Sequence, residues 1–192
     1  MFLLPFLALA HAAVPPSSTL TGTAGTLSWA VSASGGGVTI DGRSPKWTVH
    51  HVAAADLKPI HTERSDSAGA RVTVDYTAAG AVVHSGSSEK SVSGADIWDG
   101  DTVDIRLGQS VAGGHADVSF HALDPASGSL YGFEARKVAD TTCGAAACTQ
   151  VHMVMTGVYR YVGPSWDYWY GADGRLLRFQ GPIGTFAAAG AQ

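Results

Sequence analysis

Short segments in which apolar and polar residues alternate follow one another along most of the chain. In the segment ARVTVDYT, Val72, Val74 and Tyr76 share one face of a predicted strand, and the polar residues between them share the other. The same period of two recurs at residues 26–33, 37–40, 46–52, 81–85, 102–107, 117–123, 129–138, 150–159 and 165–179. The pattern predicts about ten strands, with room for a helical turn only before Pro59.

Residues that favour tight turns separate these segments. Gly35-Gly36-Gly37, Asp41-Gly42 and Asp173-Gly174 lie between alternating runs, where the chain must reverse. Strands joined in this way pair antiparallel with their sequence neighbours, and a long meander must curl to protect its edges. We therefore expect an all-β fold, an antiparallel meander curled into a half-barrel or barrel. An immunoglobulin-like sandwich is the alternative architecture.

The segment SWDYWYGADGRLLRFQGP holds the densest group of aromatic residues in the chain. With Asp173-Gly174 as a two-residue turn, its two halves form a hairpin, and Trp169 and Tyr170 lie on opposite faces. Leu176 then lies on one face and Phe179 on the other. Because both faces are partly apolar, the hairpin either packs in the core through aromatic pairs or presents one face to a ligand or partner.

The N-terminus, MFLLPFLALAHAAVPPSST, has the order of a secretory signal, with an apolar run, small residues that permit cleavage and a Pro/Ser-rich continuation. A buried strand is the alternative, because the positive residues of a signal are missing. We predict a signal peptide at 1–12, a lead-in at 13–20, one β domain at 21–186 and a flexible tail at 187–192. No later segment approaches the ~20 apolar residues of a membrane helix, and we expect a periplasmic or secreted protein.

Cys143 and Cys148 enclose a short loop in the segment CGAAAC. A hairpin can bring the ends of such a loop to the Cα separation that a disulfide needs. Free buried thiols, or a metal site that includes His152, are the alternatives. An oxidising compartment favours the disulfide.

Composition narrows the possible partners. Charged residues make up only 15% of the chain and the net charge is -4, with the 12 Lys and Arg scattered singly. No basic patch that could neutralise a phosphate backbone is visible, so nucleic acid is not an expected partner.

Candidate metal sites do not match known patterns. His115 and His121 lie on one strand face but roughly 20 Å apart at ~3.3 Å per residue, so they cannot share an ion. The segment ADIWDGDTVD is rich in acidic residues, as calcium loops are, but departs from the EF-hand spacing. We expect a solvated turn at Asp99-Gly100 and predict neither a metal nor a cofactor.

Signatures of catalysis are also missing from the sequence. There is no Gly-x-Ser-x-Gly elbow, no phosphate-binding glycine motif and no marked pair of carboxylates. We assign no catalytic residues. The sequence leaves enzymatic activity open and favours a non-enzymatic protein.

The order of several segments resembles a known group of proteins. GTLSWAVSASGGGVTI, DLKPIHTERSDSAGARVTVDYT, GSLYGFEARKV and DYWYGADGRLLRFQGP, with Leu-x-Pro at 57–59 and Trp-Tyr-x-x-Asp-Gly-Arg-Leu at 169–176, are similar to uncharacterised Gram-negative periplasmic families of unknown function. The resemblance implies a bent antiparallel sheet curled around a groove, as in the lipoprotein carriers LolA and LolB. In those carriers helices plug the concave face, and this chain is expected to lack comparable helices.

These observations lead to three functional hypotheses. The first is an exported, non-enzymatic protein that binds or carries a lipid or another apolar or amphipathic ligand. Its tentative groove residues are Trp169, Tyr170, Phe133, Met153 and Met155. The second is an envelope scaffold or assembly factor that binds another protein, and the third is a metal-dependent hydrolase.

Overall fold

A computed structural model describes residues 14–191, and the predicted signal peptide lies outside this range. The described residues form fifteen strands, one α-helix and one 3-10 helix. The elements are β1 (Ser18–Gly22), β2 (Gly25–Ser34), β3 (Gly37–Arg43), β4 (Trp47–Ala54), β5 (Pro59–Asp66), β6 (Arg71–Thr77), β7 (Gly80–Ser85), β8 (Ser88–Ser93), β9 (Ile97–Asp99), α1 (Val103–Ala112), β10 (Val118–Asp124), β11 (Ser129–Cys143), β12 (Ala146–Met155), η1 (Gly157–Arg160), β13 (Ser165–Tyr170), β14 (Leu176–Gly181) and β15 (Gly184–Ala187).

All strands belong to one sheet, in the order β8-β7-β6-β5-β4-β3-β2-β1-β15-β14-β13-β12-β11-β10-β9. Sequence neighbours pair antiparallel except for β9, which is parallel to β10, and β1 pairs with β15. The predicted all-β curled sheet is confirmed, but about ten strands was too few. The missed strands are β1, β5, β8, β9 and β15. β1, β5 and β8 are largely polar, and β9 and β15 are only three and four residues long, so none shows clear apolar alternation.

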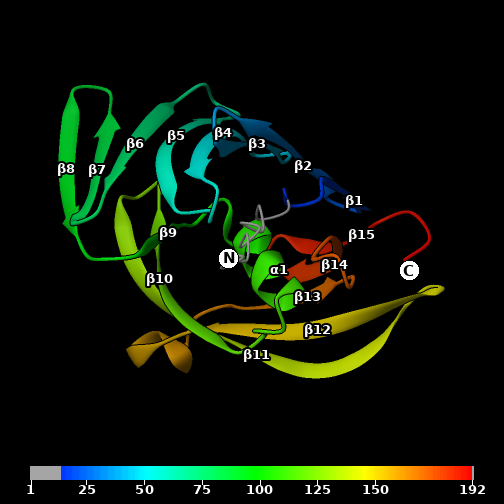
Figure 1. The fold of residues 1–192 in the computed structure, drawn as a ribbon. Helices are drawn as coiled ribbons and strands as arrows, with labels where there is room; N and C mark the ends of the chain where they lie inside the picture. The colour runs from blue at the N-terminus through cyan, green and yellow to red at the C-terminus, as the bar shows by residue number, and fades with distance from the viewer. Residues whose placement is uncertain (1–13, 192) are drawn as a thin grey trace, which may run out of the picture.

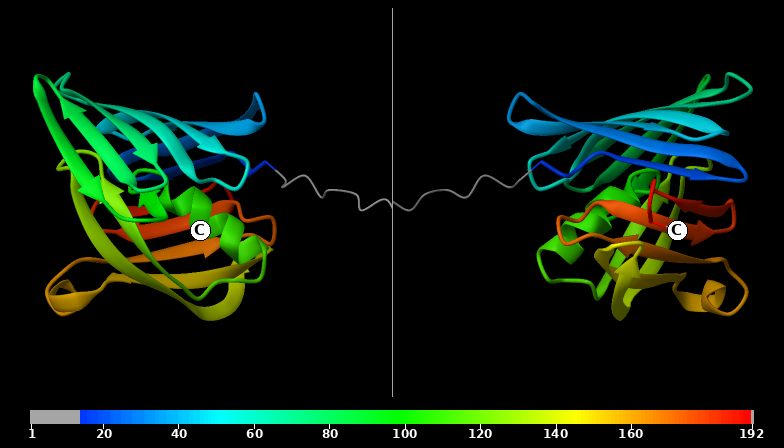
Figure 2. Two further views of the ribbon diagram at one scale, coloured as in Figure 1. Left: turned by 60° about the vertical axis from the view of Figure 1, so that its left-hand side comes forward. Right: turned by 90° about the vertical axis from the view of Figure 1, so that its right-hand side faces the viewer.

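The sheet curls into a ring of strands around α1 (Figure 1), and the side views show strands wrapping the helix above and below (Figure 2). Its two edge strands, β8 and β9, do not pair with each other. Instead Ile97 and Leu123, from β9 and β10, pack against Val74, Ala81 and Val83 on the inner face of β6 and β7. The sheet therefore closes by overlapping its ends, and side chains hold the overlap together.

The main core fills the space between the sheet and α1. Inward-facing residues such as Leu20, Ile40 and Phe186 meet Val103 and Leu107 of the helix in one buried cluster. Inside the curled sheet the helix is surrounded by apolar side chains. Among the described residues, no helix is long and apolar enough to span a membrane.

Helix α1 corrects the prediction of a strand at 102–107 and of a fold without helices. Val103, Ile105 and Leu107 alternate with polar residues, which imitates a strand. A helix enclosed by other elements is buried on most sides, so its apolar residues need not follow a single stripe. Gly108 lets the helix approach the sheet, because a Cβ there would lie 2.3 Å from the carbonyl oxygen of Gly174.

The predicted C-terminal hairpin is present as β13 and β14, but its turn is longer than Asp173-Gly174 alone. Tyr170 pairs with Leu176 and Tyr168 with Phe179, with a bulge between the two pairs. The bulge places Leu176 and Phe179 on the same buried face, whereas a regular two-residue turn would separate them. Trp169 and Tyr170 lie on opposite faces, as predicted.

Cys143 and Cys148 form the predicted disulfide at the end of the β11–β12 hairpin, with a Cα–Cα separation of 5.9 Å. Together with Ala191 they form a small buried cluster, against which Trp169 and Leu177 pack. The disulfide at the end of this long hairpin thus packs against the outer side of β13 and β14.

Candidate functional site

Three acidic residues are buried where the chain passes from the end of β9 to the first turn of α1. Asp99 and Asp104 are 1% and 7% exposed, and the side chain of Asp101 is 9% exposed. The predicted turn at Asp99-Gly100 is present and Gly100 is exposed, but the overlap of the sheet ends buries the Asp99 side chain, which was expected to be solvated. Buried carboxyl groups need hydrogen-bond or charge partners, so their surroundings define the chemistry of the interior.

Asp99 fastens β9 to the inner face of β5 and β6. Its Oδ2 accepts hydrogen bonds from Thr62 Oγ1 and from the Tyr76 hydroxyl, each at 2.6 Å. Thr62 Oγ1 also lies 2.7 Å from His51 Nδ1. Since the single hydroxyl proton of Thr62 points to Asp99, His51 donates from Nδ1. Burial lowers the pKa of His51 in spite of the nearby Asp99, which keeps this imidazole neutral at pH 7.

Asp101 forms an ion pair with Arg64 of β5 through its Oδ1 atom. Its backbone N–H donates to Asp99 Oδ1 at 2.9 Å, which ties the two acidic residues together. Burial, and then the charge of Asp99, raise the pKa of Asp101 to about 7, and Arg64 only partly opposes this shift. Asp101 can therefore gain or lose a proton near neutral pH.

Asp104 lies in the first turn of α1 and is enclosed by the aromatic residues of β13. Its carboxyl accepts a hydrogen bond from the Ile105 N–H, and its backbone carbonyl accepts one from the Tyr170 hydroxyl at 2.9 Å. Burial raises the pKa of Asp104 to about 8. Burial also raises the pKa of Tyr168, with a further contribution from Asp104. Both groups are protonated in the folded protein at neutral pH.

A cavity of about 420 Å³ lies between these acidic residues and the aromatic side chains of the sheet. This volume is within the ~300–1,000 Å³ typical of small-molecule pockets. Ile183, in the turn after β14, lines it and is 38% exposed, so the cavity reaches the surface there. Its aromatic lining residues are Trp29, Trp47, Trp166, Tyr168 and Phe179, and its charged ones are Arg64, Asp101, Asp104 and Asp124.

Two residues that line the cavity each have a buried side-chain atom without a hydrogen-bond partner within the described part of the chain. The two atoms are Trp29 Nε1, a donor, and Asp101 Oδ2, an acceptor. An unpaired buried polar group costs about 1–3 kcal/mol, so native structures rarely retain one without a reason. Together with the aromatic lining, these atoms make the cavity the candidate functional site.

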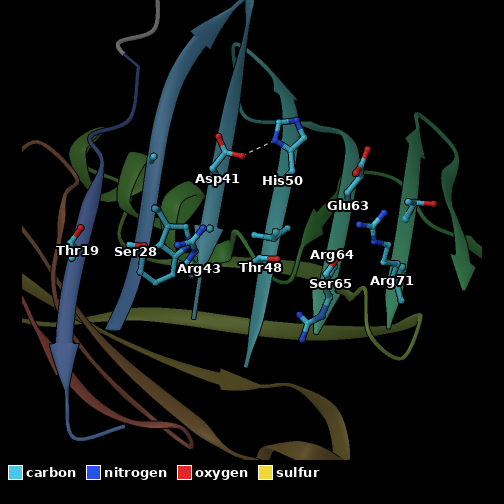
Figure 3. Close-up of a pocket in the computed structure, with 16 residues that line it drawn as sticks. Thr19, Ser28, Asp41, Arg43, Thr48, His50, Glu63, Arg64, Ser65 and Arg71 are labelled. Carbon is cyan, nitrogen blue, oxygen red and sulfur yellow. Dashed lines mark hydrogen bonds and ion pairs between the residues drawn. The ribbon is translucent and has the colours of Figure 1, made fainter. Parts of the chain in front are cut away.

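A larger polar groove of about 760 Å³ crosses the face of β1 to β6 that is turned away from α1 (Figure 3). His50 Nδ1 lies 2.7 Å from Asp41 Oδ1 in it, and these two side chains are 48% and 60% exposed. A ligand bound here would replace water around groups that are already hydrated and would bury little apolar surface. The cavity of about 420 Å³ beside α1, called the inner cavity below, is therefore the stronger candidate for the functional site.

The tentative groove residues do not form one site. Tyr170 and Met153 are buried in the main core and Met155 is also buried. Trp169 lies on the outer side, where the Arg178 guanidinium is 4.6 Å from its ring centroid. Phe133 and Tyr170 lie beside residues that line the cavity, because their ring centroids are 5.7 Å from that of Trp166 and 5.9 Å from that of Tyr168, respectively.

The described residues contain no group of three or more His, Cys, Asp and Glu side chains arranged to hold a metal ion. His121 lies within β10, whereas His115 precedes that strand, so the two do not share a strand face as predicted. On the outer sheet face, His61 lies 2.7 Å from Asp75 and 3.6 Å from Glu63. His84 lies 3.5 Å from Asp75 and 3.6 Å from Glu89.

Sequence reasoning missed the residues that form the cavity. Arg64 and Asp101 are 37 positions apart, and only the overlap of the sheet ends brings them together. The acidic segment was noticed, but its burial depends on the position of α1. The period-two pattern did contain one usable signal, because it places Arg64 on the same side of its strand as the buried Thr62.

No family model matches the sequence, and neither does any curated protein. Among solved structures, the crystal structure of a β-barrel-like protein of a domain of unknown function, DUF1849, from Brucella abortus is similar, with a TM-score of 0.60. The two chains are 10% identical, and the match covers 91% of this chain and 94% of that one. The similarity supports the predicted curled β fold.

Proposed function

We propose that the protein is an exported, non-enzymatic binding protein of the cell envelope that holds a small amphipathic ligand in the inner cavity. The observation that carries this proposal is an aromatic cavity lined by two residues, Asp101 and Trp29, each with a buried polar atom that has no partner among the described residues. An apolar ligand body would cover the indole and phenyl rings, and a polar end would satisfy Asp101 and Trp29. The signal-like N-terminus and the disulfide support export.

The cavity suits binding or carriage of a small molecule better than transport of a long acyl chain. Helix α1 and its neighbours fill most of the interior, since Leu107, Val151 and Tyr170 are fully buried there. In this respect α1 resembles the helices that plug the concave face of the sheet in the LolA and LolB carriers. The remaining space accommodates a ligand of modest size with its polar end inward.

Uptake of N-phenyl-1-naphthylamine, a neutral probe that fluoresces in apolar surroundings, tests this proposal. The wild-type protein should take up the probe saturably, and Trp166→Ala should weaken uptake at least about tenfold because an indole contact is worth more than ~1.4 kcal/mol. Trp169→Ala is the matched control, since this residue lies on the same strand but faces outward. Absence of saturable uptake, or equal uptake by all three proteins, would contradict the proposal.

One observation favours a second function, that of a scaffold that binds another protein. The segment after β12 exposes Val158, Tyr161 and Val162, which are 77%, 88% and 83% exposed, beside Arg160. Tyr and Arg are common in the centres of protein interfaces. A photo-crosslinker at position 161 should capture one defined envelope protein, while the same group at the exposed Glu89 should not. Identical products from both positions would refute this alternative.

A further inference from the structure

The cavity is lined by more carboxyl groups than cationic groups. Three carboxyl groups line it, those of Asp101, Asp104 and Asp124, against the single guanidinium of Arg64. Asp124 is satisfied by the local chain, because its oxygens accept from the Ala126 N–H and the Ser127 hydroxyl. Among the three carboxyl groups, Asp101 is therefore the one with a buried oxygen that lacks a hydrogen-bond partner within the described residues.

Asp101 can accept one more hydrogen bond from a ligand. Its Oδ1 is used by Arg64, while Oδ2 has no partner among the described residues and the side chain is more than nine-tenths buried. An anionic ligand would face this oxygen and meet repulsion, and Arg64 is already engaged. A cationic donor would instead receive a charge-assisted hydrogen bond, which is about twice as strong as a neutral one.

The aromatic lining also suits a cation. Trp29, Trp47 and Trp166 line the cavity, and indole rings attract cations through their faces. One of them does so within the protein, because the Arg64 guanidinium carbon lies 5.5 Å from the Trp47 ring centroid. Aromatic rings around a carboxylate favour an ammonium group over a neutral head group of equal size.

We propose that the ligand of this cavity carries a protonated amine, bound by Asp101 among the indole rings, and an apolar tail that points toward the opening near Ile183. This inference rests on the proposed function, whose binding site it assigns to a chemical class. Asp124 adds to the attraction, and Arg64 positions Asp101. The raised pKa values of Asp101 and Asp104 fit this role, since a bound ammonium replaces their protons as the compensating charge.

Three amphiphiles of one chain length test the head group directly. Octylamine, octanol and octanoate are each titrated against bound N-phenyl-1-naphthylamine at pH 8, where the amine is still protonated. Octylammonium should displace the probe at a concentration at least about tenfold below that of octanol, as a bond of ~1.5–3 kcal/mol requires, and octanoate should be the weakest.

Charge-neutralising variants identify the partner of the amine. Asp101→Asn should bring octylammonium to within about threefold of octanol while octanol still binds. Asp75→Asn is the control, because it removes the same charge from a side chain that is 57% exposed. If Asp101→Asn no longer takes up the probe, Asp104→Asn must show the weakened preference for the amine instead.

The outcomes separate this inference from the proposed function. If octanol or octanoate competes as well as octylammonium, or if Asp75→Asn has the same effect as Asp101→Asn, the ammonium assignment is wrong while binding in the cavity stands. If the wild-type protein takes up no probe and none of the amphiphiles binds by calorimetry, the proposed function itself fails.

Discussion

Replacing Thr62 by Val tests whether side chains close the curled sheet. Thr62 is fully buried and its hydroxyl connects Asp99 of β9 to His51 of β4. Valine has nearly the same shape, so the substitution removes the two hydrogen bonds without leaving a cavity. The edge strands do not pair with each other, so no backbone ladder between them compensates for this loss.

The expected cost follows from these two contacts. A hydrogen bond to a charged acceptor contributes ~1.5–3 kcal/mol, and an imidazole N–H left unpaired in the interior costs ~1–3 kcal/mol. The added methyl group recovers about 1 kcal/mol. We therefore expect Thr62→Val to lower the free energy of unfolding by about 2–4 kcal/mol, measured by urea titration with tryptophan fluorescence.

The control and a local measurement make the test specific. Thr48→Val changes an exposed residue of the neighbouring strand β4 and should stay within about 0.5 kcal/mol of wild type. Hydrogen exchange at residues 97–99 should accelerate ~30- to ~1,000-fold in Thr62→Val, as the same free energy implies. If Thr62→Val is as stable as Thr48→Val, or if β9 stays protected, side chains do not hold the overlap and the reasoning is wrong.

Three further predictions concern the helix, the disulfide and the buried acid. Gly108→Ala should destabilise the protein by about 1–3 kcal/mol, because its Cβ would clash with Gly174, while Gly113→Ala, whose nearest neighbour would be 3.5 Å away, should be tolerated in the same urea titration. Removing the disulfide with Cys143→Ser and Cys148→Ser together should cost ~2 kcal/mol, and reductant should then leave the stability unchanged. Burial raises the pKa of Asp104 from 3.8 to about 8, so the folded state retains a proton that the unfolded chain releases. Stability should therefore fall between about pH 4 and 8 by up to ~1.4 kcal/mol per pH unit, and Asp104→Asn should flatten this slope; an unchanged slope would contradict the burial of a protonated Asp104.

The sequence was sufficient to predict which face of most strands turns inward. Val74, Met153 and Tyr168 are buried as the period of two requires, because each strand has one face on the core. It was not sufficient for α1, because Val103, Ile105 and Leu107 alternate with polar residues in the sequence and so imitate a strand. The pairing of β1 with β15 joins residues from opposite ends of the chain, which a local pattern cannot reveal.

The candidate site was harder to predict because its parts acquire their properties only in the folded protein. An Asp in the sequence ADIWDGDTVD favours a turn, and most Asp residues in turns are solvated. Here the overlap of the sheet ends places Asp99 against Thr62 and Tyr76, and the chain then delivers Asp101 to the cavity two residues later. The aromatic density of the C-terminal hairpin was a correct indication, but Trp166 and Tyr168 line the cavity while Trp169 faces away.

Closure of the sheet and occupancy of the cavity are linked through one short segment. Asp99 accepts the Thr62 hydrogen bond that links β9 to β5 across the overlap. Asp101 lines the cavity, and its backbone N–H donates to Asp99. Two carboxylates so close together repel each other when both are charged, which is one cause of the raised pKa of Asp101. An ammonium at Asp101 would relieve this repulsion while the sheet stays closed. A ligand of this class should therefore stabilise the overlap, and slow hydrogen exchange in β9, in proportion to its occupancy.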